Sequence, residues 1–269
     1  MPTLDILDIS TTIGCNLQCK GCNHFSNYFT PTSKLDTDQL IEDMGVILPR
    51  LDVNRISIIG GEPLLNPRCE EILEACLSYH KNKVYLYSNG ILLKKNEKWI
   101  RKWLEDPRVY LRISIHIPEV EKIIFDHPKL IVTKHHTVGS MRSSREMWFS
   151  SIKRKGDKVY PYNHNRPTKS FKVCSCPNAQ LYNGYLWKCP NTAFLKELLH
   201  VTEQSDDPEW KYYLGDGLPL DCSDEELTNF CINSRLPEMV CNMCTAKPLH
   251  FSSSIQEKVK RKEINTTRS

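Results

Sequence analysis

Five short apolar runs alternate with three stretches of helical periodicity through the first half of the chain. The runs are rich in β-branched and aromatic residues and lie at 4–10, 55–59, 83–87, 109–115 and 130–133, with helical spacing at 36–48, 67–79 and 96–104. Such alternation predicts parallel strands joined by crossover helices. In folds of this kind the chemistry lies at the carboxyl ends of the strands. The loops that follow the runs are therefore the first places to search for a site.

Cysteine is the unusual component of the composition, with 12 residues in a chain of 269 that carries a net charge of +4. No apolar stretch approaches the roughly 18 residues of a membrane span, and we expect no membrane partner. The N-terminal residues MPTLDILDIST lack the basic and apolar regions of a signal peptide. We therefore expect a cytoplasmic protein with reduced thiols. In such a protein cysteines are core residues, nucleophiles or metal ligands.

Three cysteines follow the first expected strand at once, as Cys15, Cys19 and Cys22 in the pattern C-x3-C-x2-C. We call them the cysteine triad. Thiolates this close in one loop can converge on a single metal centre. Structural zinc takes four protein ligands, whereas three thiolates leave one position open, as in an iron–sulfur cluster with one iron that no cysteine binds. A zinc loop with a distant fourth ligand is the alternative.

The second expected strand ends in Gly60, Gly61, Glu62 and Pro63. Together with the triad, this Gly-Gly-Glu-Pro turn resembles the signature of the radical S-adenosylmethionine (SAM) superfamily. The resemblance covers roughly residues 8–135. It implies that the triad holds a 4Fe–4S cluster whose fourth iron binds the amino and carboxylate groups of SAM, with Glu62 accepting from the ammonium. Reduction then cleaves SAM to methionine and a 5′-deoxyadenosyl radical, which abstracts a substrate hydrogen.

The same resemblance implies further SAM contacts at the ends of the third and fourth strands, from Ser88, Asn89, Ser114 and His116. An ordinary Asn-Gly turn remains the alternative for Ser88 and Asn89. One position departs from the family, because relatives usually carry an aromatic residue where this chain has Gly21. We leave the catalytic acid, base and hydrogen donor unassigned.

A second group of cysteines lies in the last third of the chain, at Cys174, Cys176, Cys189, Cys241 and Cys244. Asn183-Gly184 between two short alternating runs predicts a β-hairpin, which would bring a cysteine at its start beside Cys189. The pattern resembles the SPASM/twitch extension of radical SAM enzymes and implies a second, auxiliary 4Fe–4S cluster. Either Cys174 or Cys176 could complete it, and a zinc knuckle is the alternative. We expect Cys69, Cys76, Cys222 and Cys231 to be packing thiols.

These observations predict an α/β fold, a partial (β/α)6 TIM-like barrel with a small cysteine-rich extension of β-hairpin and helix. The expected domains are the barrel at 1–150, the twitch-like region at 151–250 and a basic, polar, frayed tail at 251–269. Residues 134–172 carry ten Lys and Arg against two acids. We hypothesise that this stretch attracts an anionic substrate, with its aromatic residues able to stack on bases.

The function that these features favour is a radical SAM enzyme that oxidises or rearranges a small anionic molecule, such as a sugar, an amino sugar or a nucleotide-like compound. The alternatives are nucleic-acid or nucleotide base modification, peptide modification, and a non-catalytic iron–sulfur or zinc protein. Only fourteen residues precede Cys15, which disfavours a peptide-recognition domain there. An electron donor such as flavodoxin or ferredoxin is the expected protein partner, and a nucleic acid is a possible one.

Overall fold

The computed structural model describes residues 1–135, 149–251 and 256–266. One eight-stranded sheet dominates the fold, in the order β11-β10-β9-β1-β3-β4-β5-β6. Neighbouring strands run parallel from β9 to β6, whereas β10 and β11 are antiparallel additions. The strands are β1 (Thr3–Ser10), β3 (Asp52–Ile59), β4 (Lys83–Ser88), β5 (Val109–Ile115), β6 (Leu130–Lys134), β9 (Ala179–Tyr182), β10 (Tyr185–Trp187) and β11 (Leu218–Pro219). The predicted partial barrel is confirmed, and it stays open between its outer strands in the described part of the chain.

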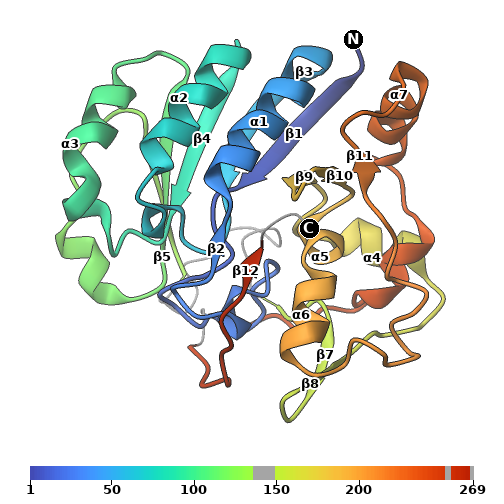
Figure 1. Cartoon of the computed structure of the whole chain (residues 1–269). Coiled ribbons are helices and arrows are strands. Elements are labelled where there is room, and N and C mark those ends of the chain that lie inside the picture. Colours follow the sequence, from blue (N-terminus) through green and yellow to red (C-terminus); the bar gives the residue numbers. More distant parts are fainter. Residues whose placement is uncertain (136–148, 252–255, 267–269) are drawn as a thin grey trace.

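Three crossover helices cover one face of this sheet (Figure 1). They are α1 (Thr37–Ile47), α2 (Cys69–Tyr79) and α3 (Leu93–Leu104). Asp36 caps α1, because its carboxylate accepts from the backbone N–H groups of Asp38 and Gln39 at 3.0 and 3.2 Å. The apolar faces of the helices pack on strand residues such as Leu7 and Ile9, which are fully buried. The connection from β5 to β6 differs, since Pro118 starts a 3-10 helix (Pro118–Lys122) where a full barrel unit has an α-helix.

The C-terminal half continues the same sheet. Strands β9 and β10 form the predicted hairpin, and both turn residues, Asn183 and Gly184, have positive φ, as a tight two-residue turn requires. The N–H of Gly184 donates to the buried Asp43 carboxylate of α1 at 2.8 Å. The helices here are α4 (Pro167–Val173), α5 (Pro190–Ala193), α6 (Leu195–Val201) and α7 (Asp224–Asn233), with a small antiparallel pair of β7 (Lys153–Lys155) and β8 (Lys158–Tyr160). Short 3-10 helices lie at Ser26–Tyr28, Leu48–Arg50, Pro63–Leu65 and Met239–Met243.

The expectation of a frayed tail is wrong for residues 256–266. Strand β12 (Asn265–Thr266) pairs in parallel with β2 (Lys34–Leu35), which follows the cysteine triad along the chain (Figure 1). Polar, basic composition suggested fraying, but the backbone of this segment is hydrogen-bonded to the first forty residues. Residues 252–255 and 267–269 lie outside the described part. Among the described helices, none combines the length and the apolar character needed to cross a membrane.

Candidate functional site

The cysteine triad lies in the loop that leaves β1. Cys19 is buried, and Cys15 and Cys22 are half-buried. Burial raises the pKa of all three thiols, that of Cys19 to about 12. N–H groups nevertheless point at the sulfurs, from Leu17 N to Cys15 Sγ at 3.4 Å and from Gln256 Nε2 to Cys19 Sγ at 3.1 Å. Such donors stabilise thiolate, and a bound metal cluster would supply the positive charge that thiolates need in a buried site. The loop therefore fits an iron–sulfur cluster.

The Gly-Gly-Glu-Pro turn is joined to this loop by its backbone. Gly61 N donates to Thr12 O at 2.8 Å, and Glu62 N donates to Gly14 O at 3.0 Å. A Cβ on Gly61 would lie 2.0 Å from Gly14 O, and Gly60 has a φ of +144°. Only glycine permits this approach. The glycines thus bring the loop after β3 against the triad loop, and Pro63 begins the 3-10 helix that follows.

Glu62 joins the turns after β3 and β4. Its carboxylate is fully buried and accepts from Ser88 Oγ at 2.8 Å, from Asn89 N at 2.7 Å and from Leu64 N at 3.1 Å. Burial raises the Glu62 pKa to about 7, although these hydrogen bonds favour the ionised form. Asn89 also donates through Nδ2 to Asn16 Oδ1 at 2.6 Å. The predicted residues Glu62, Ser88 and Asn89 are therefore brought together beside the triad loop.

The other predicted contacts lie farther along the sheet. Ser114 is near the end of β5, in register with Thr133 of β6, and the His116 ring stacks on His135 at 4.9 Å between centroids. The departure at Gly21 has a structural reason. Gly21 has a φ of +76°, and a Cβ there would lie 2.5 Å from Phe149 O. The backbone of a later segment thus fills the space beside the position where relatives carry an aromatic ring.

The C-terminal cysteines converge from four places. Cys174 follows α4, Cys176 precedes β9, Cys189 caps α5, and Cys241 and Cys244 lie at the Met239–Met243 turn. The Sγ atoms of Cys174 and Cys176 are 3.8 Å apart. Burial raises the Cys244 pKa first, and the neighbouring thiols Cys189, Cys174 and Cys241 raise it further. Both candidates for the fourth ligand therefore lie within the group.

Polar side chains around the C-terminal cysteines stabilise negative charge on their sulfur atoms. The fully buried Asn191 donates from Nδ2 to Cys244 Sγ at 3.1 Å. The Cys174 pKa falls to about 7, chiefly because it receives a hydrogen bond from Cys176, with a smaller contribution from Lys188. The four remaining cysteines, Cys69, Cys76, Cys222 and Cys231, lie in the apolar core as expected. No group of three or more His, Cys, Asp or Glu side chains in the described ranges is placed for a single metal ion, so cluster ligation at either site is a proposal.

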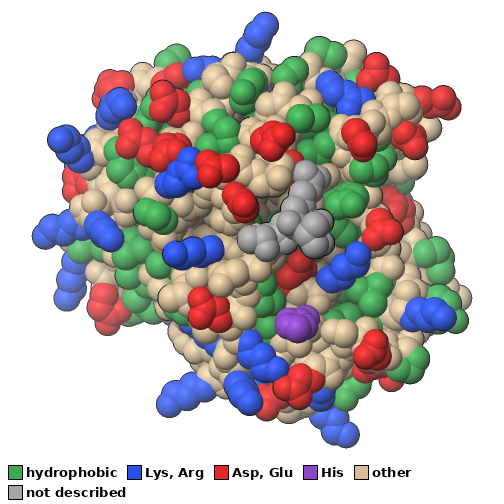
Figure 2. All heavy atoms as spheres, viewed as in Figure 1, with side chains coloured by type: hydrophobic (Ala, Val, Ile, Leu, Met, Phe, Trp, Pro, Cys, Tyr) green, Lys and Arg blue, Asp and Glu red, His purple; other side chains and the backbone are tan. Residues whose placement is uncertain are grey.

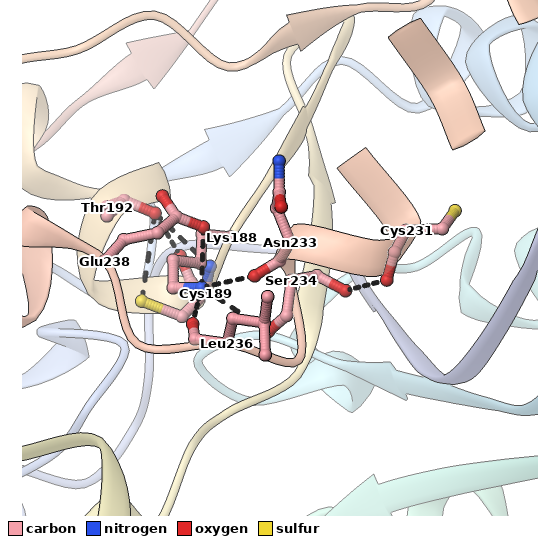
Figure 3. Close-up of polar contacts among 8 residues, drawn as sticks. All are labelled: Lys188, Cys189, Thr192, Cys231, Asn233, Ser234, Leu236 and Glu238. Atoms are coloured by element: carbon pink, nitrogen blue, oxygen red, sulfur yellow. Dashed lines mark hydrogen bonds and ion pairs between the residues drawn. The ribbon is translucent and has the colours of Figure 1, made fainter. Parts of the chain in front are cut away.

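Lys188 is a residue of this region that sequence reasoning missed. Its Nζ donates to Leu236 O at 2.7 Å and Asn233 O at 3.1 Å and forms an ion pair with Glu238 at 2.7 Å (Figure 3). The side chain is only 10% exposed. Lys188 thus ties the end of the hairpin to the loop that leads to Cys241. Figure 3 also shows the Cys231 sulfur across this network from the Cys189 sulfur.

The basic stretch at 134–172 is described only in part, since Arg142 and Arg145 lie outside the described residues. Lys134 is ion-paired with Glu121, and Arg154 with Glu257 at 2.8 Å. Lys158 Nζ donates to the carbonyls of Thr202 and Glu203. Figure 2 shows lysine and arginine interspersed with acidic side chains over the face it presents. Several basic side chains of the stretch therefore already have partners within the same chain.

Arginines and tyrosines gather on the sheet face opposite the helices, a feature that the sequence analysis overlooked. Arg112 lies over the Tyr87 ring at 5.6 Å, and Arg55 lies over the Tyr85 ring at 5.0 Å. Tyr85 in turn stacks on Tyr110 at 4.9 Å. Alternation along a strand, in which every second residue shares a face, is the signal that could have found them. Guanidinium and phenol groups together suit a ligand with anionic and planar parts.

Asp8 lies on this same face and gives a testable pH dependence. It is 4% exposed, and its carboxylate accepts from Asn178 Nδ2 at 3.1 Å. Burial raises its pKa from 3.8 to about 6, so the folded chain holds this proton more tightly than the unfolded chain. The associated stability is present below about pH 4 and is lost as the pH rises to about 6. We expect Asp8→Asn, relative to wild type, to gain about 1.5 kcal/mol in free energy of unfolding between about pH 5 and pH 7.5. Urea unfolding at both pH values checks this, and a constant difference would contradict it.

A cysteine triad after β1, joined through the backbone to the Gly-Gly-Glu-Pro turn of an open parallel sheet, is the arrangement that the resemblance to radical SAM enzymes implies. The chain belongs to the radical SAM superfamily, whose sequence model matches residues 9–153, more than half of the protein. The match implies SAM and a 4Fe–4S cluster as cofactors and supports a radical SAM enzyme.

Its relatives include GTP 3′,8-cyclases. The chain is 33% identical to the GTP 3′,8-cyclase of Aquifex aeolicus over 122 residues, which cover 44% of this chain and 37% of the cyclase. It is 38% identical over 97 residues to the probable GTP 3′,8-cyclase of Methanocaldococcus jannaschii, covering 33% of this chain and 29% of that protein. These matches span only about a third of the curated relatives' length. Among solved structures, BtrN in complex with AdoMet and 2-DOIA aligns with a TM-score of 0.46 at 14% identity, covering 95% of this chain and all of BtrN.

Proposed function

We propose that Cys15, Cys19 and Cys22 hold the SAM-binding cluster and that SAM lies against the turns after β3, β4 and β5. When bound and reduced, the cluster supplies one electron that cleaves SAM into methionine and a 5′-deoxyadenosyl radical. The chain's own part is to hold the loops in place. Glu62 accepts from Leu64 N and Ser88 Oγ through Oε1 and from Asn89 N through Oε2, which leaves one lone pair of Oε2 for the ammonium of SAM. Gly60, Gly61 and Pro63 set the turn, and Ser114 and His116 complete the SAM-facing edge.

A second proposal is that residues 151–250 are a twitch-type region with an auxiliary 4Fe–4S cluster. Four of the five grouped thiols would ligate it, with Cys189, Cys241 and Cys244 joined by Cys174 or Cys176. The convergence of these thiols, and the N–H of Asn191 aimed at Cys244 Sγ, support this reading. None of the twelve cysteines forms a disulfide bond, which suits the reducing cytoplasm. The proposed electron donor is flavodoxin or ferredoxin.

For the substrate we propose a purine nucleoside phosphate, which is oxidised or rearranged after hydrogen abstraction. The observation that carries this proposal is the sequence identity to GTP 3′,8-cyclases, whose name states a nucleotide substrate. The face of Arg55, Arg112 and the three tyrosines supports it, because guanidinium groups bind phosphate in a bidentate manner and phenol rings stack on bases.

The test uses the anaerobically reconstituted full chain with dithionite and SAM. We expect GTP to raise 5′-deoxyadenosine formation about tenfold above the rate without substrate, and deuterium from ribose-labelled GTP to enter the deoxyadenosine. Guanosine, an amino sugar and an RNA oligonucleotide are compared at equal concentration. Arg112→Gln should remove the stimulation by GTP, whereas Arg68→Gln, at the helix side of the sheet, should keep it. Stimulation by the amino sugar or the RNA alone would contradict the nucleotide proposal.

A further inference from the structure

The segment 256–266, which we call the C-terminal strap, is hydrogen-bonded along the triad loop. Glu257 N donates to Gln18 O at 2.8 Å, and Gln18 Nε2 donates to Val259 O at 3.0 Å. Cys19 and Gln256 form an antiparallel bridge. The strap then continues into β12, which runs beside β2 (Figure 1). The triad loop, a short segment rich in turns, is thus held by a strand-like partner from the other end of the sequence.

Arg261 is the second anchor of the strap. Its guanidinium donates to Cys15 O at 3.0 Å and to Leu17 O at 2.5 Å. The Nε–H is buried and has no hydrogen-bond partner within the described residues. A cation and an unused donor therefore lie against the backbone of a loop whose thiolates would carry negative charge. That placement favours an anionic group in the loop.

The side chain of Gln256 contacts one of the triad cysteines directly. Its Oε1 accepts from Gln18 N at 2.9 Å. A backbone N–H can only donate, so this contact fixes which end of the amide is oxygen. The other end, Nε2, consequently faces Cys19 Sγ, at 3.1 Å. This is shorter than the 3.4 Å from Leu17 N to Cys15 Sγ.

We propose that the strap is a built-in positioning element of the SAM-binding cluster and that the Gln256 amide raises the reduction potential of that cluster. The inference rests on the proposed ligation by Cys15, Cys19 and Cys22. A hydrogen bond to a ligand sulfur stabilises the reduced cluster more than the oxidised one, because the reduced cluster holds more negative charge. Gln256 is thus a positioning residue outside the Cys and Gly-Gly-Glu-Pro motifs, and its effect is on how readily the cluster accepts an electron.

The experiment compares reconstituted full-length wild type with Gln256→Leu, Gln256→Glu and Lys262→Met by EPR-monitored redox titration without SAM. Gln256→Leu removes the donor, and Gln256→Glu keeps an acceptor for Gln18 N while placing an acidic oxygen near Cys19. Lys262→Met is the matched control, since it removes the strap's ion pair with Glu203 and touches no sulfur. Both Gln256 variants should show about a tenfold lower ratio of reduced to oxidised SAM-binding cluster at a fixed potential, or about 59 mV for one electron. Lys262→Met should match wild type.

Iron and sulfide are measured in every sample, so that failure of the proposed function can be distinguished from failure of the present inference. If wild type binds no cluster at the triad, the proposed function fails. If all variants bind it and the Gln256 potentials equal that of wild type, only the present inference fails. An equal shift in Lys262→Met would also overturn it, because the effect would then come from the strap as a whole. Should Gln256→Leu lose its cluster, Gln256→Glu carries the measurement.

Discussion

Replacing Cys15, Cys19 and Cys22 together with alanine is expected to abolish SAM cleavage. The loss should reach about a thousandfold or more, equivalent to about 4 kcal/mol of barrier height. Without the three thiolates nothing in the loop can hold the iron that binds and reduces SAM. The iron content of reconstituted protein should fall by about four per chain, the content of one 4Fe–4S cluster. Deoxyadenosine formation and iron are measured anaerobically on the same samples.

The matched control replaces two cysteines outside both groups, Cys69 and Cys76 of α2, with alanine. Both thiols are buried in the core, so the variant should lose about 1–2 kcal/mol of stability through poorer packing and keep iron and SAM cleavage. If the triple variant still cleaves SAM, or if wild type holds zinc at the triad, the assignment of the cluster fails. Full activity in the control, against none in the triple variant, separates ligation from packing.

The fold could be predicted because its signals are local. The runs at 109–115 and 130–133 appear as β5 and β6 with at most one residue of change, and Asp36 caps α1 as its side chain suggests. Chain connectivity decides such elements, since parallel strands need crossover segments. The same locality revealed the triad, because its three cysteines lie within eight residues.

The parts that the sequence did not reveal depend on contacts between distant positions. The strap at 256–266 reads as a polar tail, and only its pairing with the first forty residues makes it ordered structure. Lys188 looks like one more surface lysine until three backbone carbonyls surround it. Local composition cannot report a partner fifty or two hundred residues away, so such residues emerge only in three dimensions.

Replacing Cys241 and Cys244 with alanine is expected to preserve SAM cleavage and to abolish formation of the final product. SAM cleavage should stay within about threefold of wild type, because the triad and the Gly-Gly-Glu-Pro turn are untouched. Formation of the final product should fall by about a hundredfold or more, since the proposed auxiliary cluster would be absent and could neither bind the substrate nor accept an electron from it. Iron should fall by about four per chain, the content of the second cluster. Product is followed by mass spectrometry with GTP as the substrate, beside deoxyadenosine.

Cys222 and Cys231 provide the control for that double variant, because they lie in the same third of the chain but in the apolar core. Their replacement with alanine should leave both iron and product unchanged while lowering stability by about 1–2 kcal/mol. A Cys241/Cys244 variant that keeps all its iron would place the second cluster elsewhere. If wild type holds zinc there and the Cys241/Cys244 variant loses that zinc, the C-terminal cysteines form a structural zinc site. A simultaneous loss of SAM cleavage would contradict the expected separation and would mean that the two sites fold as one unit, since a single sheet runs from β9 to β6.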